Sequence, residues 1–388
     1  MKHTKLILPT IVFSQFCCTS LWFAGNGVMD DLMKTFKLNA SALGNLTSAV
    51  QFGFILGTLI FAIFAISDRF SPSKVFLTCA TIAAIFNGGT LWENNNLLSI
   101  LSLRFFTGFF LAGIYPVGMK IAADHFEKGL GKSLGFLVGA LVIGTALPHL
   151  AKEMTDTLLW KTVIILTSLL SIIGGLCMFF LVPDGPYRKQ GNQIKFSAFL
   201  KIFRDKHFRS AAFGYFGHMW ELYAFWAFVP FILKKYVSQH SGMTLNIPLW
   251  SFLIIGIGGP ACVLSGYLAE AFGTKKIAFI ALLLSGVCCL ISPIIFETAS
   301  IYLFVTFLLI WGMFVIADSP LFSTLVAQNA APEIKGTALT IVNSIGFATT
   351  IISIQLLNYM QESINPIYLF LPLAIGPLLG LSALAQKQ

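Results

Sequence analysis

Long apolar runs separated by short polar segments dominate the sequence. Most runs are close to the roughly 20 residues that a helix needs to cross about 30 Å of hydrocarbon. They are apolar at successive positions, whereas the strands of a membrane barrel alternate apolar and polar residues. The pattern therefore predicts twelve membrane-spanning helices. They cover residues 6–28, 42–66, 75–92, 97–122, 132–151, 159–182, 209–233, 248–269, 276–296, 299–325, 334–359 and 364–385.

Composition supports this interpretation of the pattern. Hydrophobic residues make up 56% of the chain and charged residues 11%, against about 25% charged residues in soluble domains. Mean hydropathy is +0.83. The first run follows Lys2 and Lys5, as a signal peptide would, but it is long, lacks a small-residue cleavage pattern and has many apolar successors, which indicates a first span. The fold class expected is an all-α integral membrane protein with about 12 transmembrane helices.

A charged loop occurs twice, between the second and third runs and again between the eighth and ninth. Asp68 lies in the first loop, and Glu270 occupies the matching place about 200 positions later. Gly108 and Pro116 of the fourth run recur in the tenth run. A repeat at this distance predicts two similar six-helix bundles of parallel topology. The expected boundaries are 1–182 for the first bundle, 183–207 for a basic cytoplasmic linker and 208–388 for the second bundle.

Basic residues set the expected orientation. Of the 25 Lys and Arg residues, 17 lie in segments on the side of the N-terminus and six on the opposite side. Cytoplasmic segments are enriched in Lys and Arg, so both termini are expected in the cytoplasm. The net charge of +9 then reflects topology and contact with lipid headgroups, and no nucleic-acid partner is expected.

The loop and the fourth run carry a family resemblance. Asp68, Arg69 and Lys74 match in outline the Gly-x-x-x-Asp-Arg-x-Gly-basic-basic loop of the major facilitator superfamily, although Phe64 and Ser71 stand where that motif has glycines. Arg104 followed by Gly108 resembles the motif in the fourth span of the family. The second loop keeps Gly266, Gly273, Lys275 and Lys276, with Glu270 as its acid. Over essentially the whole chain, the sequence resembles a transporter of this superfamily.

The resemblance implies two bundles that rock about one central site, which opens to each side of the membrane in turn. It also implies that charges in the two loops act as a conformational latch, pairing in one state and separating in the other. A solvated turn that anchors the ends of spans is the alternative. The antiporter motif of the fifth span is poorly matched by Gly135 to Gly139, which favours symport or uniport. The residues assigned to the latch are Asp68, Arg69, Lys74, Glu270 and Lys275.

Ionisable residues inside spans are the sharpest signals, since each costs roughly 2.5–3.5 kcal/mol at the centre of a membrane helix. His218 and Glu221 lie three residues apart in the seventh run and share a helix face. Removing a carboxyl group from water favours its protonated form. We therefore expect Glu221 to couple transport to protons or to bind substrate, with His218 as its partner. The alternative is an internally satisfied pair that holds the bundle together.

Two further ionisable groups lie in the fourth and tenth runs. Arg104 is always charged and needs a carboxylate or an anionic substrate nearby; family analogy implies an influence on proton coupling. Its alternative is snorkelling toward the headgroups. Asp318 precedes Ser319 and Pro320 and either takes part in proton coupling or caps a break in the helix.

Aromatic residues and one amide mark a candidate substrate cavity. Trp22 and Asn26 share a helix face in the first run, with glycines that permit close approach or unwinding. Aromatic walls with few polar groups are typical of sites for small organic ligands, although aromatic residues also fill membrane bundles without any such role. The substrate-binding residues expected are Trp22, Asn26, Arg104, Trp220, Glu221, Tyr223, Trp226 and Trp311.

No enzyme motif is present: the chain has no phosphate-binding glycine loop with lysine, no nucleophile elbow and no metal-ligand cluster. All seven cysteines fall in apolar runs, so neither a disulfide framework nor a metal site is expected, and no cofactor either. The function expected is secondary active transport of a small organic solute by alternating access, coupled to protons. An organic anion is favoured, because Arg104 cannot be neutralised. The alternatives are an efflux transporter of the multidrug or siderophore type, or a transporter-like sensor. Short loops favour a monomer in a bacterial inner membrane.

Overall fold

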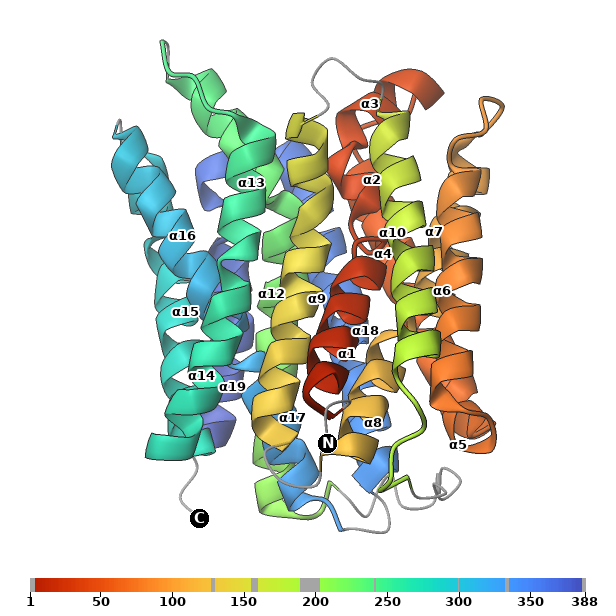
Figure 1. Cartoon of the computed structure of the whole chain (residues 1–388). Helices are drawn as coiled ribbons and strands as arrows, with labels where there is room; N and C mark the ends of the chain where they lie inside the picture. Colours follow the sequence, from red (N-terminus) through yellow and green to blue (C-terminus); the bar gives the residue numbers. More distant parts are fainter. Residues whose placement is uncertain are drawn as a thin grey trace.

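The computed structural model describes residues 4–126, 130–154, 160–188, 203–240, 242–298, 300–331 and 335–385. Every regular element in these ranges is a helix. Most helices run roughly parallel to one another, and α1 begins at the same end of the molecule at which α19 ends (Figure 1). We call this end the inner end and the opposite one the outer end. The even number of crossings expected from sequence agrees with this placement.

The first half of the chain forms six spans, of which the first, second and fourth are interrupted. The spans pack against one another through α1 with α9 and α10, α4 with α7, and α6 with α7 and α10. Their helices are α1 (Thr4–Thr19), α2 (Ala24–Gly27), α3 (Met29–Phe36), α4 (Ala42–Ile63), α5 (Ile66–Arg69), α6 (Pro72–Gly89), α7 (Leu97–Leu111), α8 (Tyr115–His125), α9 (Leu130–Met154) and α10 (Lys161–Leu181).

The second half repeats this arrangement. In it α12 packs against α19 and α17, and α15 packs against α16. Its elements are α12 (Lys206–Gln239), α13 (Ile247–Gly256), α14 (Gly258–Phe272), α15 (Thr274–Phe296), α16 (Ile301–Ala317), α17 (Ser319–Asn329), α18 (Lys335–Ser363), the 3₁₀ helices η3 (Pro366–Tyr368) and η4 (Leu371–Ala374), and α19 (Ile375–Ala385).

Nine helices in the described ranges are long and apolar enough to cross a membrane. Three others complete the twelve spans: α1, whose apolar part covers only Leu6–Thr19, α6 with 18 residues, and α12 with 34 residues. The prediction of about 12 helices in two six-helix bundles is confirmed. The continuous first span expected over 6–28 is wrong, because α1 ends at Thr19 and the chain resumes as α2 at Ala24.

The sequence repeat appears in the structure as a matched pair of helix breaks. The fourth span divides between α7 and α8, and the tenth divides between α16 and α17. Pro116 and Pro320 are each the second residue of the new helix. Proline lacks the backbone N–H that an interior helical position needs, and its ring suits the first turn. The repeated glycine and proline positions therefore mark the same local structure in both halves.

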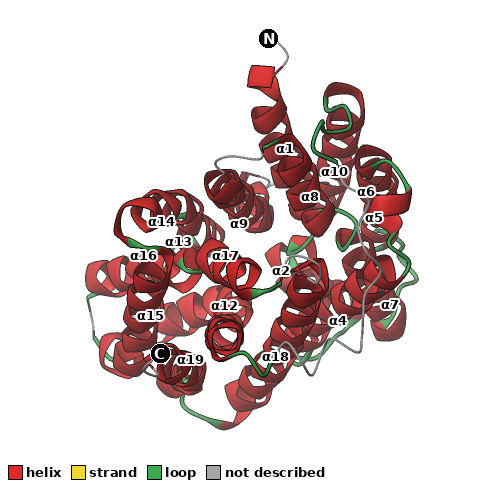
Figure 2. Ribbon diagram, turned by 90° about the horizontal axis from the view of Figure 1, so that it is seen from below, coloured by secondary structure: helices red, strands yellow, loops and turns green. Residues whose placement is uncertain are grey.

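The two bundles meet along two pairs of spans: α4 packs along α18, and α9 packs along α13 and α14. Figure 2, seen from the inner end, shows the two halves side by side with these helices between them. Backbones approach closely here, since a Cβ added to Gly139 would lie 2.9 Å from the Gly259 carbonyl oxygen. Small residues permit such contacts between membrane helices. Residues 189–202 of the expected linker lie outside the described residues.

Candidate functional site

An aromatic cluster fills the centre of the bundle interface. Trp22, at the break between α1 and α2, stacks on Tyr223 of α12 with ring centroids 5.7 Å apart and on Phe347 of α18 at 5.8 Å. Phe54 of α4 lies 4.8 Å from Trp22 and 4.5 Å from Phe347. Trp226 packs edge-on against Tyr223 at 5.4 Å. All five side chains are buried, so this central cluster joins the two halves through ring contacts.

Polar atoms without partners accompany the central cluster. Among the described residues, the indole nitrogens of Trp22 and Trp226, the side-chain amide of Gln51 in α4 and the hydroxyl of Ser344 in α18 are buried and make no hydrogen bond. Leaving such a group unpaired costs about 1–3 kcal/mol. Donors and acceptors of this kind, next to aromatic surface, are suited to hold water or a polar solute.

Arg104 of α7 is buried, with 1% of its surface exposed, and secures the break in the first span. Its Nη2 donates to the carbonyl oxygens of Leu21 at 2.9 Å and Trp22 at 2.7 Å. Its Nη1 donates to Asn87 Oδ1 at 2.9 Å. Both carbonyls lie where the helix is interrupted, and the Leu21 oxygen also accepts from the Ala24 backbone N–H at 3.4 Å. Neither snorkelling to water nor a carboxylate partner describes this arginine: its fork holds the unwound segment that carries Trp22.

Glu221 lies in the middle of α12 and is 1% exposed. Its Oε1 accepts hydrogen bonds from Ser285 Oγ at 2.5 Å and from Trp311 Nε1 at 2.6 Å. These donors belong to α15 and α16, so Glu221 joins three helices of the second bundle. Both donors are neutral, and no lysine or arginine in the described ranges forms an ion pair with this carboxyl group.

His218 takes a different partner from the one expected. Its Nδ1 lies 2.7 Å from Asp318 Oδ1, with both side chains 1% exposed, whereas Glu221 is held by Ser285 and Trp311. The expected His218–Glu221 contact is therefore wrong, although the two residues share a helix. Asp318 stands at the break between α16 and α17, as predicted, but its side chain makes no capping hydrogen bond there.

The other residues predicted to bind substrate lie in two different parts of the molecule. Trp220 donates from Nε1 to the carbonyl oxygen of Pro372 at 3.2 Å, and Trp311 packs on Phe225 with centroids 4.6 Å apart. Both tryptophans therefore lie inside the second bundle, away from the central cluster. Asn26 donates to Thr47 Oγ1 at 2.9 Å and lines a cavity at the outer end.

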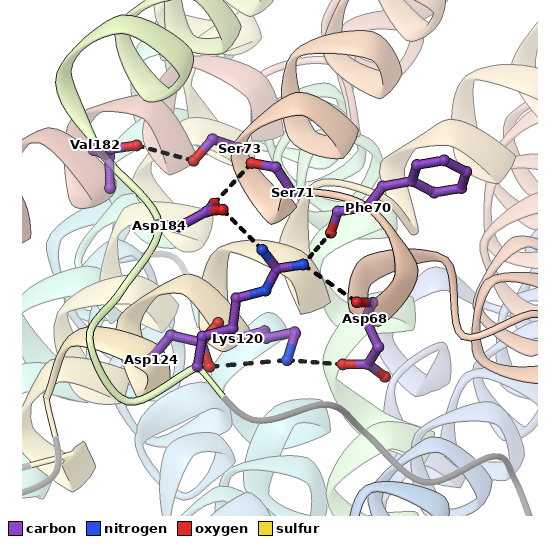
Figure 3. A network of polar contacts seen from close by, with 9 residues as sticks. Asp68, Phe70, Ser71, Ser73, Lys120, Asp124, Val182 and Asp184 are labelled. Carbon is purple, nitrogen blue, oxygen red and sulfur yellow. Dashed lines mark hydrogen bonds and ion pairs between the residues drawn. The ribbon is translucent and has the colours of Figure 1, made fainter.

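The first charged loop is held within its own bundle (Figure 3). Asp68 Oδ1 lies 2.9 Å from Lys120 Nζ of α8. Arg188, which follows α10, donates from Nη2 to the carbonyl oxygens of Asp68 at 3.2 Å and Phe70 at 2.8 Å. Its Nη1 donates to Asp184 Oδ2 at 2.8 Å. Asp68 thus connects the loop to the fourth span, and Arg188 connects the loop to the segment after the sixth.

The remaining latch candidates lie at the surface. Arg69, Lys74 and Glu270 are exposed, and Lys275 is partly exposed. Across the bundles, Lys132 Nζ of α9 lies 4.5 Å from the ring centroid of Tyr267 in α14. The second loop therefore meets the first bundle through Lys132, a residue that the sequence pattern did not single out.

Several site residues were missed from the sequence. Phe347 joins the central cluster from α18, and the unpaired Gln51 and Ser344 lie about one helical turn before Phe54 and Phe347. Gln51 carried a usable signal, since an amide in a long apolar run is costly unless paired. Phe347 carried none, because phenylalanine occurs 38 times in the chain. Lys120 was not singled out as a partner of Asp68, and Arg188 was expected only as part of the basic linker.

The chain is similar in sequence to known transporters. The family model of the Major Facilitator Superfamily matches residues 11–354. AraJ of Escherichia coli (strain K12), described as a candidate transporter, is 20% identical over 71% of this chain and 68% of its own length. YgaY of Escherichia coli O157:H7, described as an uncharacterised transporter, is 23% identical over 58% of this chain and 59% of its own length.

A solved structure shares the fold over the full length. The crystal structure of the nucleoside transporter NupG, determined as a point mutant, superposes with a TM-score of 0.72, covering 99% of this chain and 100% of that one. Identity is 16%, so the likeness concerns the fold alone.

Proposed function

Because the chain belongs to the Major Facilitator Superfamily of transporters, we propose that it moves a small organic solute across a membrane by alternating access, coupled to protons. Family membership indicates a transporter and not an enzyme. The central cluster at the bundle interface supplies the solute site, and the buried carboxyl groups of the second bundle carry the proton. As each bundle rocks against the other, the interface opens toward one end of the molecule and then the other.

The observation that carries the proton-coupling proposal is the surroundings of Glu221. A carboxylate inside a membrane helix is costly unless a cation pairs with it, and the donors on Glu221 are the neutral Ser285 and Trp311. Protonation removes the charge and leaves these two hydrogen bonds in place, since one oxygen accepts both. Glu221 can thus hold a proton while the bundle stays closed and release it when the interface admits water. The His218–Asp318 pair lies one turn away and offers a second place for the proton.

The central cluster supports a solute with a flat, unsaturated portion. Such a solute can replace one ring contact of Trp22 by its own, and the unpaired groups of Trp226 and Gln51 can bind its polar atoms. This feature also favours a second candidate function, efflux of a flat amphipathic compound. The direction of transport measured in oriented vesicles separates the two. A transporter-like sensor is the third possibility, and it would show binding without flux.

The preference for an anion rests on different residues from those expected. Both Nη atoms of Arg104 are used by the carbonyls of Leu21 and Trp22 and by Asn87, so this arginine does not argue for an anionic solute. Support comes instead from lysines around the cavity at the outer end. A monomer in a bacterial inner membrane, with the inner end in the cytoplasm, agrees with the excess of basic residues at that end.

The test combines ligand binding with a single carboxyl substitution. A solute that binds only the folded state raises the melting temperature by mass action. Purified wild type and Glu221→Gln are screened against metabolites, organic anions, amines and drugs at about pH 5 and about pH 8, on either side of the usual titration range of histidine. We expect at least one solute to raise the melting temperature. The size of this rise should depend on pH in the wild type and not in Glu221→Gln.

The same solute is then followed in proteoliposomes. Glu221→Gln should abolish accumulation driven by a pH gradient and keep counterflow exchange, because exchange needs no net proton movement. Glu297→Gln, at an exposed glutamate after α15, is the matched control and should accumulate normally. Normal accumulation by Glu221→Gln would remove this residue from the mechanism and leave the His218–Asp318 pair as the place for the proton.

A further inference from the structure

A cavity lies at the outer end, and none of the five residues of the central cluster lines it. It has a volume of about 450 Å³, within the range of small-molecule sites. Its walls come from both bundles: α2, α3 and α9 on one side, and α12 and α13 on the other. Part of its lining is apolar and includes Met29, Met33, Leu43 and Phe231. We call it the outer vestibule.

Two ion pairs border the outer vestibule, and one of them crosses between the bundles. Lys152 Nζ of α9 lies 2.8 Å from Asp31 Oδ2 of α3, within the first half. Lys234 of α12 pairs with Asp30 of α3, and so connects the second half to the first. Opening this end of the interface requires the Asp30–Lys234 pair to separate, whereas Asp31–Lys152 can move with its own bundle.

A buried histidine lines the same space. His149 of α9 is 3% exposed, and its Nε2 makes no hydrogen bond to any described residue. It lies among the residues that line the vestibule, together with Lys234. Close packing holds it there, because a Cβ on Gly27 would lie 2.8 Å from the Cβ of the neighbouring Pro148. A buried nitrogen without a partner is a group that a bound polar molecule can satisfy.

The charges of the lining do not cancel. Asp30 and Asp31 are each matched by a lysine, and Lys235 remains, with its Nζ 5.5 Å from the ring centroid of Phe231. A positive charge beside apolar walls suits a molecule with an acidic group on an apolar body. A confined site with one excess charge raises the local concentration of ions of opposite sign.

We propose that the outer vestibule is a binding site for a small organic anion with an apolar body, which it admits when the Asp30–Lys234 pair opens. This proposal rests on the proposed transport function for its place in the cycle. Its preference for anions is a property of the vestibule itself. It can therefore be tested without a substrate and without flux.

The test compares two thiol reagents of similar size and opposite charge. A single cysteine at Met33, which lines the vestibule and is partly exposed, is labelled with sulfonatoethyl and trimethylammonioethyl methanethiosulfonate. Thr35→Cys, exposed on the same helix, corrects for intrinsic reactivity. Background is measured on the unsubstituted protein, whose cysteines are buried except for the partly buried Cys177.

The ratio of anionic to cationic rates at Met33→Cys, divided by the same ratio at Thr35→Cys, should exceed about three. Adding Lys235→Gln should bring the ratio close to one, while Lys161→Gln, at an outer-end lysine paired with Glu93, should leave it unchanged. Asp30→Asn should speed both reagents because it releases the cross-bundle pair, and should speed the anionic one more, because it leaves the charge of Lys234 unmatched. Leu43→Cys replaces Met33→Cys if the latter fails to fold.

A ratio near or below one at Met33→Cys, or one that is insensitive to Lys235→Gln, overturns the proposal. The two proposals can fail separately. If Glu221→Gln accumulates solute normally, the proposed proton coupling at Glu221 fails, but the labelling ratio at Met33→Cys is unchanged. Labelling of Met33→Cys from the inner end alone would also overturn the proposal, because the Asp30–Lys234 pair lies at the outer end.

Discussion

Buried ionisable side chains in this protein are satisfied in two different ways. Arg104 donates to two carbonyl oxygens and an amide oxygen, and its positive charge stabilises a segment that has lost its helical hydrogen bonds. Glu221 accepts from two neutral donors, so its carboxyl group can gain a proton and keep both hydrogen bonds. The first arrangement favours a fixed structural role, and the second favours a change of state.

The role of Arg104 can be tested by a substitution that keeps the charge. Arg104→Lys retains the cation but cannot reach two carbonyls and Asn87 with one planar fork. Hydrogen bonds to charged groups contribute about 1.5–3 kcal/mol each, so the loss of one or two should lower the unfolding free energy by about 2–4 kcal/mol. Denaturant unfolding in detergent measures this change.

Arg204→Lys, at an exposed position before α12, is the control and should be neutral. If Arg104→Lys is equally neutral, the contacts at the break of the first span do not contribute to stability.

For single residues, the sequence predicted which side chains are buried but not which side chains contact one another. The spacing of His218 and Glu221 places them on one face of any helix, but it does not show that they contact each other. Their actual partners, Asp318, Ser285 and Trp311, arrive from other helices. Which residue faces another across a bundle depends on the rotation and axial shift of whole helices, which a single sequence does not encode in a local pattern.

The interruptions of the spans have two different causes. The breaks before Pro116 and Pro320 follow from a residue that cannot continue a helix, and they were predictable. The break at residues 20–23 contains no proline. There Arg104 of α7 donates to the carbonyl oxygens of Leu21 and Trp22, beside the turn hydrogen bonds that the backbone keeps. Sequence alone therefore indicated a possible loosening at Gly25 and Gly27 and placed it slightly too late.

The Asp68–Lys120 pair links two elements of the same bundle, α5 and α8, with a separation of 2.9 Å. We expect Asp68→Asn to slow conformational cycling more than it weakens substrate binding, since α5 lies at the inner end of the molecule (Figure 1). Lys120→Gln, which also removes the longer contact with Asp124 at 3.8 Å, should slow cycling too. The double variant should be no slower than Lys120→Gln, because both substitutions remove the Asp68–Lys120 pair. Exchange rates and melting shifts, measured side by side, separate cycling from affinity.

Lys74→Gln, at an exposed lysine of the same loop, is a useful comparison. A pure loss of affinity in Asp68→Asn, or additive effects of the two substitutions, would count against a latch made by this pair.

The molecule consists of two similar bundles, and different side-chain contacts join them at the outer end and at the inner end. At the outer end, Asp30–Lys234 and the amides of α4 and α18 cross the interface: Gln355 Nε2 donates to Ser48 Oγ at 2.9 Å. At the inner end, Lys132 lies over Tyr267. The central cluster lies between these two sets of contacts. Each end therefore has contacts of its own that can open while those of the other remain closed.

The architecture was the most predictable part of the molecule. Twelve apolar runs, a charged loop that occurs twice and matched proline positions determine the spans and the two halves, because hydrocarbon permits few alternatives to packed helices. The site was less predictable. Trp22, Tyr223 and Trp226 lie together at the bundle interface, whereas Trp220 and Trp311 lie within the second bundle. Tryptophans that line a cavity and those that fill a core look alike in a sequence.

The measurement that tests the account most directly follows both ends of the molecule at once. Spin labels are placed at Thr35 and Ser238 of the outer end, and at Phe70 and Phe272 of the inner end, all four exposed. Distances between labels are then recorded in lipid nanodiscs at about pH 5 and about pH 8, in the wild type and in Glu221→Gln. The account predicts that the change in pH lengthens one distance while shortening the other, and that Glu221→Gln holds both at one value. Distances that ignore pH in the wild type, or that lengthen and shorten together, would contradict proton-coupled alternating access.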